Sequence, residues 1–342
     1  MNLIIKQYSE VSQKQWDDFV YSNSMGWAYF LYDLIAFDWF SYNKNLSFVI
    51  VDNDNHDEII MMVQLHEINK SALRVKLNLG NKLFSRWGYI LKDNLTKKQI
   101  KKVKQVFEEY IDNYISEHRI RKFAINLPPL TDKFILHKEN VNPLIYFNFF
   151  PGVRYTYVVD LSKPQGSMLA DCEETTRQII RKFENSCMYR VIEATSSEED
   201  CLAYIKLHKE TYFRTDHKKH ILSDDYHKNM FYKLIPQKVC RVFFLVNQKT
   251  DEKVAAVSIL IHKDTAYYWW GCSKNDKEIG VNKYLLFKVM NIIKDSFSHS
   301  GYFETGGAHI HLRGGKEKGL SDFKKCFGTF LIPIFTGEYC KK

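Results

Sequence analysis

The chain has 342 residues, 45% of them hydrophobic and 26% charged, and this composition excludes extensive disorder. An excess of 49 Lys and Arg over 40 Asp and Glu leaves a formal net charge of +9, which favours anionic partners such as nucleotide phosphates, RNA or an acidic membrane surface, although a solvated lysine-rich surface produces the same excess. The seven cysteines are scattered and form no Cys-x-x-Cys pair, so a disulfide framework and a zinc knuckle are excluded.

The first half of the sequence predicts a mixed α/β region. Its predicted elements are, in chain order, a strand at 3–6, a helix at 13–21, strands at 47–52, 58–68 and 72–79, a helix at 96–118 and a strand at 122–127. The polar turn at 53–57 is typical of an antiparallel hairpin between two of these strands. In the long helix, apolar residues recur every three or four positions opposite a lysine-rich face, which indicates a helix with one buried side.

The second half repeats this order of elements. Its predicted elements are a helix at 168–186, a strand at 189–194, helices at 198–213 and 224–235, strands at 241–247, 253–262 and 265–271, a helix at 281–297, a strand at 302–304, a helix at 320–327 and a strand at 330–335. Each half has an antiparallel hairpin, then a long helix, then a further strand, so the architecture repeats although the sequence does not. We place the junction at 145–155 and expect two domains, 1–150 and 151–342.

Three arginines are candidates for binding phosphate groups. Arg177 and Arg181 are four residues apart on a predicted helix, so they share a face and could grip a phosphate. The alternative for this pair is a basic solvated face. Arg214, at the end of the next predicted helix, could bind a diphosphate or could instead cap the helix carbonyls.

The last eighty residues carry the most informative motifs. Tyr268 and Trp270 lie two positions apart in a predicted strand, so we expect them to share a face, which is either core or the wall of a substrate groove. The turn Gly280-Val281-Asn282 opens a helix whose free N–H groups could hold an anion, with an ordinary loop as the alternative. After Gly306-Gly307, the histidines at 309 and 311 could line a cleft, and either could act as a general base or lie exposed on a loop.

Lys324 is the predicted catalytic residue. It lies between Phe323 and Phe327 on a short predicted helix, so its aliphatic stem should run along apolar surface. An ammonium held there could stabilise the oxyanion that forms when an amine attacks a carbonyl. The alternative is an amphipathic surface lysine like its neighbour Lys325.

Several other chemistries are disfavoured because their motifs are missing. The sequence has no Gly-x-Gly-x-x-Gly, Walker or Gly-x-Ser-x-Gly pattern, which argues against redox, ATP-driven and serine-hydrolase chemistry. Histidines at 217, 220 and 227 lack a matching carboxylate motif, so no metal site is predicted.

The order of these motifs resembles the Fem-type branch of the GNAT acyltransferase superfamily, which includes tRNA-dependent peptidyltransferases that build peptidoglycan cross-bridges. The resemblance covers roughly 155–335 and rests on Thr156–Ser162, Arg181-Lys182, Thr211-x-x-Arg214, Tyr268–Ser273, Gly280–Asn282, Gly306-Gly307 and Gly319-Leu320-x-x-Phe323-Lys324-x-x-Phe327-Gly328. It implies an α/β (α+β) fold of two tandem GNAT-like domains, each a mixed, largely antiparallel sheet flanked by helices. This fold matches the doubled order of elements described above.

The resemblance also implies roles for particular residues. Lys324 matches a lysine thought to stabilise the transferred carbonyl, and Arg214 matches an arginine that binds the diphosphate of a UDP-linked precursor. The full set of residues expected to bind substrate is Arg177, Arg181, Arg214, Tyr268, Trp270, Asn282, Gly306, Gly307 and Phe327.

Three departures from the family pattern narrow this expectation. Bridge-forming members often carry a lysine four residues after a tryptophan in the N-terminal domain, whereas this chain has Trp27-Ala28-Tyr29-Phe30-Leu31 and no lysine through Phe40. Phe183 replaces the alanine that usually follows Arg181-Lys182, and Glu304-Thr305 replaces the aspartate before the double glycine. The first departure argues against a peptidoglycan precursor as the substrate.

We therefore expect an N-acyltransferase that moves an acyl or aminoacyl group from an activated carrier to an amine acceptor by direct attack. The expected acceptor is a sugar nucleotide or another cell-envelope precursor. The expected co-substrate is an acyl-CoA, an acyl carrier or an aminoacyl-tRNA, and no tightly bound cofactor is expected. The alternatives are an aminoacyl-tRNA-dependent peptidoglycan bridge peptidyltransferase and a non-catalytic GNAT-fold binding module.

The expected location is the cytoplasm. The start of the chain lacks a signal-peptide pattern, and no apolar run is long enough to span a membrane. Scattered free thiols fit a reducing compartment. Peripheral contact with the inner face of the membrane is a further candidate interaction, and DNA is not an expected partner.

Overall fold

The computed structural model describes residues 1–35, 43–68, 71–72, 77–78, 81–132, 141–216, 222–274, 280–297 and 301–341. The chain divides into two compact units, one made of Met1–Arg154 and Pro333–Lys342 and the other of Tyr155–Ile332. We call these unit 1 and unit 2. Two strands, β11 (Phe149–Asp160) and β17 (Phe330–Tyr339), begin in one unit and end in the other.

Unit 1 contains a four-stranded antiparallel sheet in the order β1-β3-β4-β9. Its strands are β1 (Leu3–Gln7), β3 (Phe48–Asp52), β4 (Glu58–Val63) and β9 (Tyr89–Leu91). The predicted hairpin around the turn at 53–57 is confirmed, because β3 and β4 pair antiparallel across it. All five residues of β3 are buried, as expected of a short strand that is apolar in its first four residues.

The remaining strands of unit 1 pair in the order β17-β10-β8-β5-β2, with only β10 and β8 parallel among these pairs. They are β2 (Asn43–Asn45), β5 (His66–Ile68), β8 (Lys82–Ser85) and β10 (Lys122–Asn126), and a small pair is formed by β6 (Ser71–Ala72) and β7 (Leu77–Asn78). The prediction of one strand at 58–68 was wrong, since β4 and β5 belong to different sheets. The chain changes sheet at Gln64, whose side chain accepts a hydrogen bond from the backbone N–H of Trp87. Part of the predicted strand at 72–79 lies outside the described residues.

The helices of unit 1 are α1 (Gln13–Ser22), α2 (Tyr32–Ile35) and α3 (Lys97–Glu117). Helix α3 begins at a capping box in which the side chains of Thr96 and Gln99 each accept a hydrogen bond from the other residue's backbone N–H. In its apolar stripe, Val103, Phe107 and Ile111 are fully buried. The predicted helix at 96–118 is therefore confirmed to within one residue at each end.

Unit 2 is built on six strands in the order β12-β13-β14-β15-β16-β11. These are β12 (Tyr189–Glu193), β13 (Cys240–Asn247), β14 (Glu252–His262), β15 (Thr265–Ser273), β16 (Tyr302–Ala308) and β11. Neighbouring strands are antiparallel except β15 and β16, which are parallel. The parallel pair is possible because α9 crosses between them.

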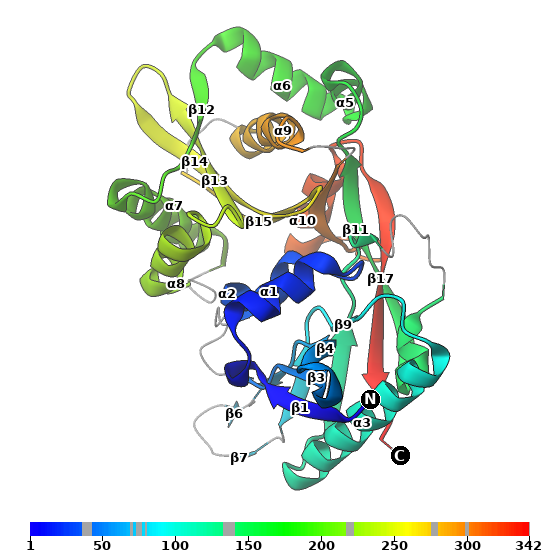
Figure 1. Ribbon diagram of the computed structural model, residues 1–342. Coiled ribbons are helices and arrows are strands. Elements are labelled where there is room, and N and C mark those ends of the chain that lie inside the picture. Colours follow the sequence, from blue (N-terminus) through cyan, green and yellow to red (C-terminus); the bar gives the residue numbers. More distant parts are fainter. Residues whose placement is uncertain are drawn as a thin grey trace. The chain divides into compact units, whose positions relative to one another are not determined.

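The helices of unit 2 are α5 (Gln165–Asp171), α6 (Glu174–Ser186), α7 (Glu198–Asp216), α8 (Asp224–Asn229), α9 (Val281–Lys294) and α10 (Lys316–Lys325). In Figure 1, α9 lies against one face of the sheet, and α7 and α8 lie against the other. The prediction of one helix at 168–186 was wrong, because Cys172 and Glu173 have extended backbone angles and separate α5 from α6.

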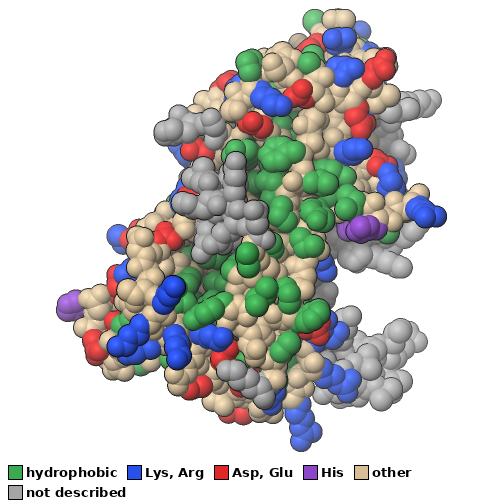
Figure 2. Space-filling model, turned by 90° about the vertical axis from the view of Figure 1, so that its right-hand side faces the viewer, with side chains coloured by type: hydrophobic (Ala, Val, Ile, Leu, Met, Phe, Trp, Pro, Cys, Tyr) green, Lys and Arg blue, Asp and Glu red, His purple; other side chains and the backbone are tan. Residues whose placement is uncertain are grey.

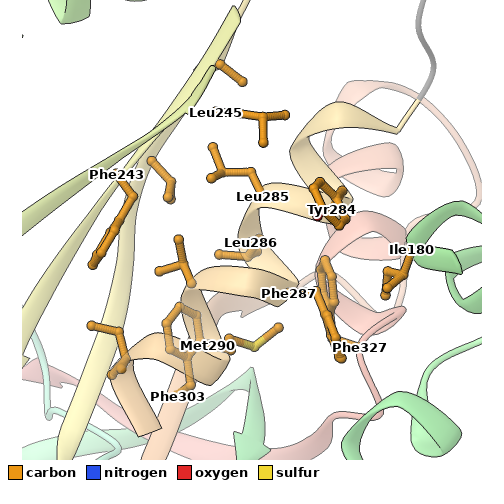
Figure 3. Packing of buried hydrophobic residues seen from close by; sticks show 14 of the residues in the cluster. Ile180, Phe243, Leu245, Tyr284, Leu285, Leu286, Phe287, Met290, Phe303 and Phe327 are labelled. Atoms are coloured by element: carbon orange, nitrogen blue, oxygen red, sulfur yellow. The ribbon is translucent and has the colours of Figure 1, made fainter. Parts of the chain in front are cut away.

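A continuous hydrophobic core fills the space between the sheet and α9. Figure 3 shows Phe243 and Leu245 on the strands facing Leu285 and Leu286 of α9, while Phe287 faces the side of α6. The cluster also includes Ile180 of α6, Phe303 of β16 and Phe327 after α10. The side chains of α9 thus form the centre of the hydrophobic core on this face of the unit 2 sheet. The mixed α/β fold expected from the sequence is confirmed.

The predicted junction at 145–155 overlaps the end of the short 3-10 helix Pro143–Phe147 and the first half of β11. The division between the two units, after Arg154, lies inside this range. The last ten residues group with unit 1 rather than with unit 2. As independently folding domains, 1–150 and 151–342 remain a prediction.

The surface carries charges of both signs. On the face shown in Figure 2, hydrophobic side chains gather in the middle, and Lys, Arg, Asp and Glu side chains lie around them. The net charge of +9 therefore does not by itself define an anion-binding face. Within the described ranges, every helix is too short or too polar to cross a bilayer.

Candidate functional site

Lys324 lies in α10 of unit 2, with its ammonium directly over the backbone of β16. A Cβ atom added to Gly306 would lie 2.8 Å from Lys324 Nζ and 3.2 Å from its Cε. The missing side chain at Gly306 therefore leaves the space that the ammonium occupies. Gly306 has φ +106°, a backbone conformation that glycine adopts without strain and other residues rarely adopt.

The strand is irregular at this point because it contains a β-bulge. Val158 of β11 is opposite Glu304, and its neighbour Tyr157 is opposite Gly306, so Thr305 is the extra residue. The Thr305 hydroxyl donates to the carbonyl oxygens of Tyr157 (3.2 Å) and Lys324 (3.3 Å). The bulge thereby ties the end of α10 to the sheet.

A buried carboxylate lies in the same bulge of β16. Glu304 is 1% exposed, and its Oε1 accepts a hydrogen bond of 2.6 Å from Oγ1 of Thr156, which is itself fully buried. Burial lowers the pKa of the Lys324 ammonium, while the negative charges of Glu304 and, less strongly, Glu317 oppose this shift. The Lys324 cluster, defined as Thr156, Glu304, Gly306 and Lys324, thus contains a buried carboxylate and a half-buried ammonium at one bulge of the strand.

A second polar group gathers around Ser273 at the end of β15. Arg214 of α7 donates to the Ser273 carbonyl oxygen from two guanidinium nitrogens, at 3.4 and 3.3 Å. Thr211 donates to the same oxygen (2.9 Å) and accepts from the Ser273 N–H (2.8 Å), and Asn282 Nδ2 donates to Ser273 Oγ (3.1 Å). Two residues predicted to bind substrate, Arg214 and Asn282, are therefore brought together by one serine.

Arg214 is exposed although part of its guanidinium contacts the backbone. A guanidinium has five N–H donors in a planar fork, so these contacts fix its orientation and leave donors for a ligand. Asn282 follows Gly280, which begins α9 with φ +106° and packs so closely that an added Cβ would lie 2.6 Å from Ile179 Cγ2. The start of α9 is therefore held against α6.

The expectation that Tyr268 and Trp270 share a face was wrong, because β15 also contains a bulge. Trp270 is opposite Ser258 in β14, and Tyr268 is opposite the next residue, Ile259, so the extra residue is Trp269. Since Ser258 and Ile259 point to opposite faces, their partners do as well.

The two aromatic residues consequently have different surroundings. Tyr268 packs on the α9 side, with its ring 6.3 Å from that of Phe323, and burial raises the pKa of its hydroxyl. Trp270 packs on the α7 side, with its ring 6.1 Å from His208 and 6.2 Å from Tyr212. Only Tyr268 lies on the side of the sheet from which Lys324 projects.

Arg177 and Arg181 have different roles in the structure. The Arg177 guanidinium donates to the carbonyl oxygens of Ala170 (3.1 Å) and Cys172 at the end of α5, so it stabilises the break between α5 and α6. Arg181, one turn later, is exposed. The two arginines share one helix, but only Arg181 is exposed to solvent.

The remaining predicted residues divide between core and open surface. Phe327 is 1% exposed and belongs to the hydrophobic core, with its ring 5.6 Å from Phe323. At Gly307 an added Cβ would meet nothing within 4 Å. His309 is exposed and lies 3.3 Å from a Glu317 oxygen, and His311 is exposed as well.

Sequence reasoning missed two buried histidines on the α7 side. His208 of α7 and His227 of α8 are both fully buried, with ring centroids 4.3 Å apart. Their ring nitrogens find no hydrogen-bond partner among the described residues. Burial lowers the pKa of His208 to about 4, and burial followed by His208 and Lys209 lowers that of His227 to about 3. The other two histidines of the group considered at 217, 220 and 227 lie outside the described residues.

Comparisons with known proteins agree with this architecture. Residues 170–295 match the family model described as an acetyltransferase (GNAT) domain. No curated protein sequence matches the chain.

Among solved structures, FemX has a TM-score of 0.68 at 14% identity, covering 98% of this chain and 97% of that one. The L-PGS structure from Bacillus licheniformis has a TM-score of 0.59 at 11% identity and covers 97% and 93% of the two chains. A tandem GNAT protein from the clavulanic acid biosynthesis pathway has a TM-score of 0.54 at 8% identity and covers 98% of both chains.

The chain therefore has the fold of tandem GNAT proteins, as the resemblance implied. The matched domain supports acyl transfer in general.

Proposed function

We propose that the protein is an N-acyltransferase in which an acceptor amine attacks an activated acyl carbonyl directly, and Lys324 stabilises the oxyanion. The observation that carries the proposal is the half-buried Lys324 ammonium held over Gly306, within unit 2, most of which matches an acetyltransferase domain. A fixed positive charge in a water-poor position stabilises a developing negative charge far more strongly than it would in water.

In this reaction the amine nitrogen forms a bond to the carbonyl carbon, and the carbonyl electron pair moves onto oxygen beside Lys324. The electron pair then returns, the bond to the carrier breaks, and the amine proton leaves with solvent or with the departing carrier. The products are an amide and a free carrier. Catalysis then depends on orientation and charge stabilisation, without an acyl-enzyme.

The proposed donor is an acyl-CoA, an acyl carrier or an aminoacyl-tRNA, and the proposed acceptor is an amine on a sugar nucleotide or another cell-envelope precursor. The Arg214–Ser273–Asn282 group supports binding of a phosphate-bearing ligand, because Arg214 is exposed and already oriented by Ser273. The exposed Arg181 is a second candidate phosphate contact. Peripheral membrane contact, if the precursor is lipid-linked, belongs to the same proposal.

A thermal-shift screen against acyl-CoAs, UDP-sugars and tRNA tests the proposal, because a ligand that binds the native state raises the unfolding midpoint. We expect a donor or an acceptor of these classes to raise it. Stabilisation by tRNA that disappears as salt rises would favour the aminoacyl-tRNA-dependent transferase. No stabilisation by any of the three classes would count against all of these substrates.

Lys324→Ala then tests the chemistry with the pair of substrates found. Loss of a charged oxyanion contact should lower the transfer rate by about 10²–10³-fold. Lys325→Ala is the matched control, since Lys325 is the next residue of α10 and is exposed. Equal rates for the two variants would remove Lys324 from the mechanism. Ligand binding without turnover would instead support a non-catalytic binding module.

A further inference from the structure

The exposed hydrophobic side chains of unit 1 are concentrated in one short segment. Five large side chains are exposed there, namely Val141 (70%), Ile145 (53%), Tyr146 (44%), Phe150 (71%) and Val153 (51%). In the rest of the described part of unit 1, Tyr21 is the one other large hydrophobic side chain with comparable exposure. We call the five residues the apolar loop. Single exposed hydrophobic residues are ordinary, whereas a group of them indicates an interaction surface.

The fold directs these side chains outward. The 3-10 helix η4 (Pro143–Phe147) buries Leu144 and Phe147, and the Phe147 ring packs edge-on against an aromatic ring of α3. Ile145 and Tyr146 lie between these two buried residues and are left on the solvent side. Because the inward side of η4 is already occupied by core residues, the exposed side chains cannot turn into the core.

Side-chain hydrogen bonds hold the segment together. Asn142 Nδ2 donates to the carbonyl oxygens of Gly152 (3.1 Å) and of Thr336 in β17 (2.9 Å). Asn148 Nδ2 donates to the carbonyl oxygen of Cys340, just after β17 (2.6 Å). The two ends of the segment are therefore joined, and its apolar side chains form one fixed group.

A row of lysines begins α3 next to the apolar loop. Positions 97–104 read Lys-Lys-Gln-Ile-Lys-Lys-Val-Lys, without an acidic residue. Lys104 Nζ lies 4.7 Å from the centroid of the Tyr146 ring and 3.7 Å from an oxygen of Glu108, so this lysine joins the helix to the apolar loop. The other four lysines are exposed, and we call them the α3 lysines: Lys97, Lys98, Lys101 and Lys102.

The position of these lysines is unfavourable for the helix itself. The N-terminal end of a helix carries a partial positive charge, and like charges four residues apart repel each other, as at 97 and 101 or at 98 and 102. The first turn of α3 has no acidic residue to offset this repulsion. An anionic surface next to this end of the helix would relieve both repulsions.

We propose that the apolar loop and the α3 lysines together form a docking surface for an anionic lipid bilayer. The side chains of the apolar loop enter the boundary between headgroups and acyl chains, and the lysines contact the anionic headgroups. The inference deepens the membrane contact included in the proposed function, and it rests on that function only for the purpose of the contact.

A bilayer matches both parts of this surface, whereas other partners match one. RNA would pair with the lysines, but it offers no apolar interior for aliphatic side chains such as Val141 and Ile145. A second copy of the chain in a symmetric dimer would bring the lysines of both copies into one interface, where like charges repel. Charge and apolar character therefore select the bilayer.

Co-sedimentation of the full chain with lipid vesicles tests the proposal. We expect binding to vesicles of equimolar phosphatidylcholine and phosphatidylglycerol, little binding to phosphatidylcholine alone, and weaker binding as salt rises. Equal binding to the two kinds of vesicle would contradict the role of the lysines. The absence of binding to either would overturn the proposal.

A charge variant tests the α3 lysines. Lys101→Gln combined with Lys102→Gln should weaken partition onto the mixed vesicles by about 25-fold at low salt, roughly fivefold for each lysine. The matched control is Lys228→Gln combined with Lys249→Gln, which removes the same charge from exposed positions of unit 2. Equal losses in the two variants would assign binding to net charge and overturn the assignment to α3.

An apolar variant tests the loop. Ile145→Ser combined with Phe150→Ser should weaken partition by about 10- to 100-fold, because two apolar side chains no longer enter the bilayer. The matched control is Tyr21→Ser combined with Leu202→Ser, which removes two exposed hydrophobic side chains elsewhere. If the loop variant does not fold, Phe150→Ser alone replaces it, with an expected loss of about tenfold.

Two results for the loop variant would overturn the proposal. One is partition equal to that of the control variant. The other is a lipid-free dimer of the unsubstituted chain, seen by sedimentation velocity, that the loop variant loses, because the loop would then bind a second copy. Vesicle binding needs neither an acyl donor nor an acceptor. Its failure would therefore leave acyl transfer to a soluble acceptor standing, and a failed ligand screen would leave the docking surface standing.

Discussion

The Lys324 cluster and the His208–His227 pair both bury titratable groups within unit 2, but only the cluster contains groups of opposite charge. In the cluster, the Thr156 hydroxyl anchors the Glu304 carboxylate, and the Lys324 ammonium lies over Gly306 of the same strand. The two imidazoles instead lie against aromatic side chains, and burial keeps them neutral. Unit 2 therefore buries titratable side chains in two ways, as charged groups in the cluster and as neutral rings in the histidine pair. The two regions should respond differently to pH and to mutation.

The pH dependence of stability should show the largest difference. Because the folded pKa of each histidine lies below the ordinary value of 6.5, the unfolded chain takes up protons first as the pH falls. The contribution of these histidines is complete above about pH 6.5 and should decline by up to about 1.4 kcal/mol per pH unit for each histidine towards pH 4. Urea unfolding between pH 8 and 4 measures this slope.

The slope can be assigned to the pair by substitution. His208→Phe combined with His227→Leu should make it shallower, since neither replacement can be protonated; His66 and His262, whose pKa burial also lowers, account for the slope that remains. An equally steep slope in the double variant would show that the buried pair is not responsible.

Removal of the anchor of Glu304 should have the next largest effect. Thr156→Val keeps the shape of the side chain and removes the hydrogen bond to a buried charge, which should lower the free energy of unfolding by about 1.5–3 kcal/mol at pH 7. Thr305→Val is the control: its hydroxyl is equally buried but donates to neutral carbonyls, so about 1 kcal/mol is expected. Equal losses would contradict the special role of charge in the cluster.

A side chain at Gly306 should disturb Lys324 directly. Gly306→Ala introduces a Cβ 2.8 Å from Nζ at a backbone angle that alanine rarely adopts, so unfolding should become easier by about 1–3 kcal/mol and the transfer rate should fall. Gly307→Ala is the control, because it adds a Cβ at the next residue, where nothing lies within 4 Å. Denaturant unfolding of both variants should therefore separate them, and identical curves would argue against close packing of Lys324 on β16.

The smallest effect concerns the two arginines of α6. Arg177→Ala removes hydrogen bonds to two carbonyl oxygens at the end of α5 and should cost about 1 kcal/mol in thermal or urea unfolding. Arg181→Ala, on the exposed side, should change stability by less than about 0.5 kcal/mol. If Arg181→Ala proves the more damaging of the two, the assignment of Arg177 as the stabilising residue is incorrect.

Much of the local structure could be predicted because it depends on nearby residues. The apolar period and the Thr96 capping box located α3 closely, and the polar turn at 53–57 located the hairpin. Predictions failed where a contact with a distant part of the chain overrode the local pattern. The single strand predicted at 58–68 divides at Gln64, whose side chain accepts a hydrogen bond from the Trp87 N–H, and the bulge in β15 depends on its pairing with β14.

The candidate site also contains residues that the sequence indicated and residues that only the structure revealed. Lys324 and the double glycine were visible in the sequence, since a lysine framed by aromatic residues is a local pattern. Glu304 appeared only as a departure from the family pattern. Its partner Thr156 is 148 residues away, and no spacing rule connects them. His208 was missed because a single histidine in a helix gives no indication of its burial.

By itself, the sequence determined most of the order of helices and strands, the repeated architecture and the candidate residue Lys324, because hydrophobic periodicity and short motifs act within one element. The tertiary structure alone decided which side chains share an environment. Two bulges, at Trp269 and Thr305, change which face each later residue occupies, and the position of a bulge depends on pairing with a neighbouring strand. For the same reason, only the folded chain brings the Glu304 carboxylate to the Thr156 hydroxyl and leaves His208 and His227 in an apolar interior.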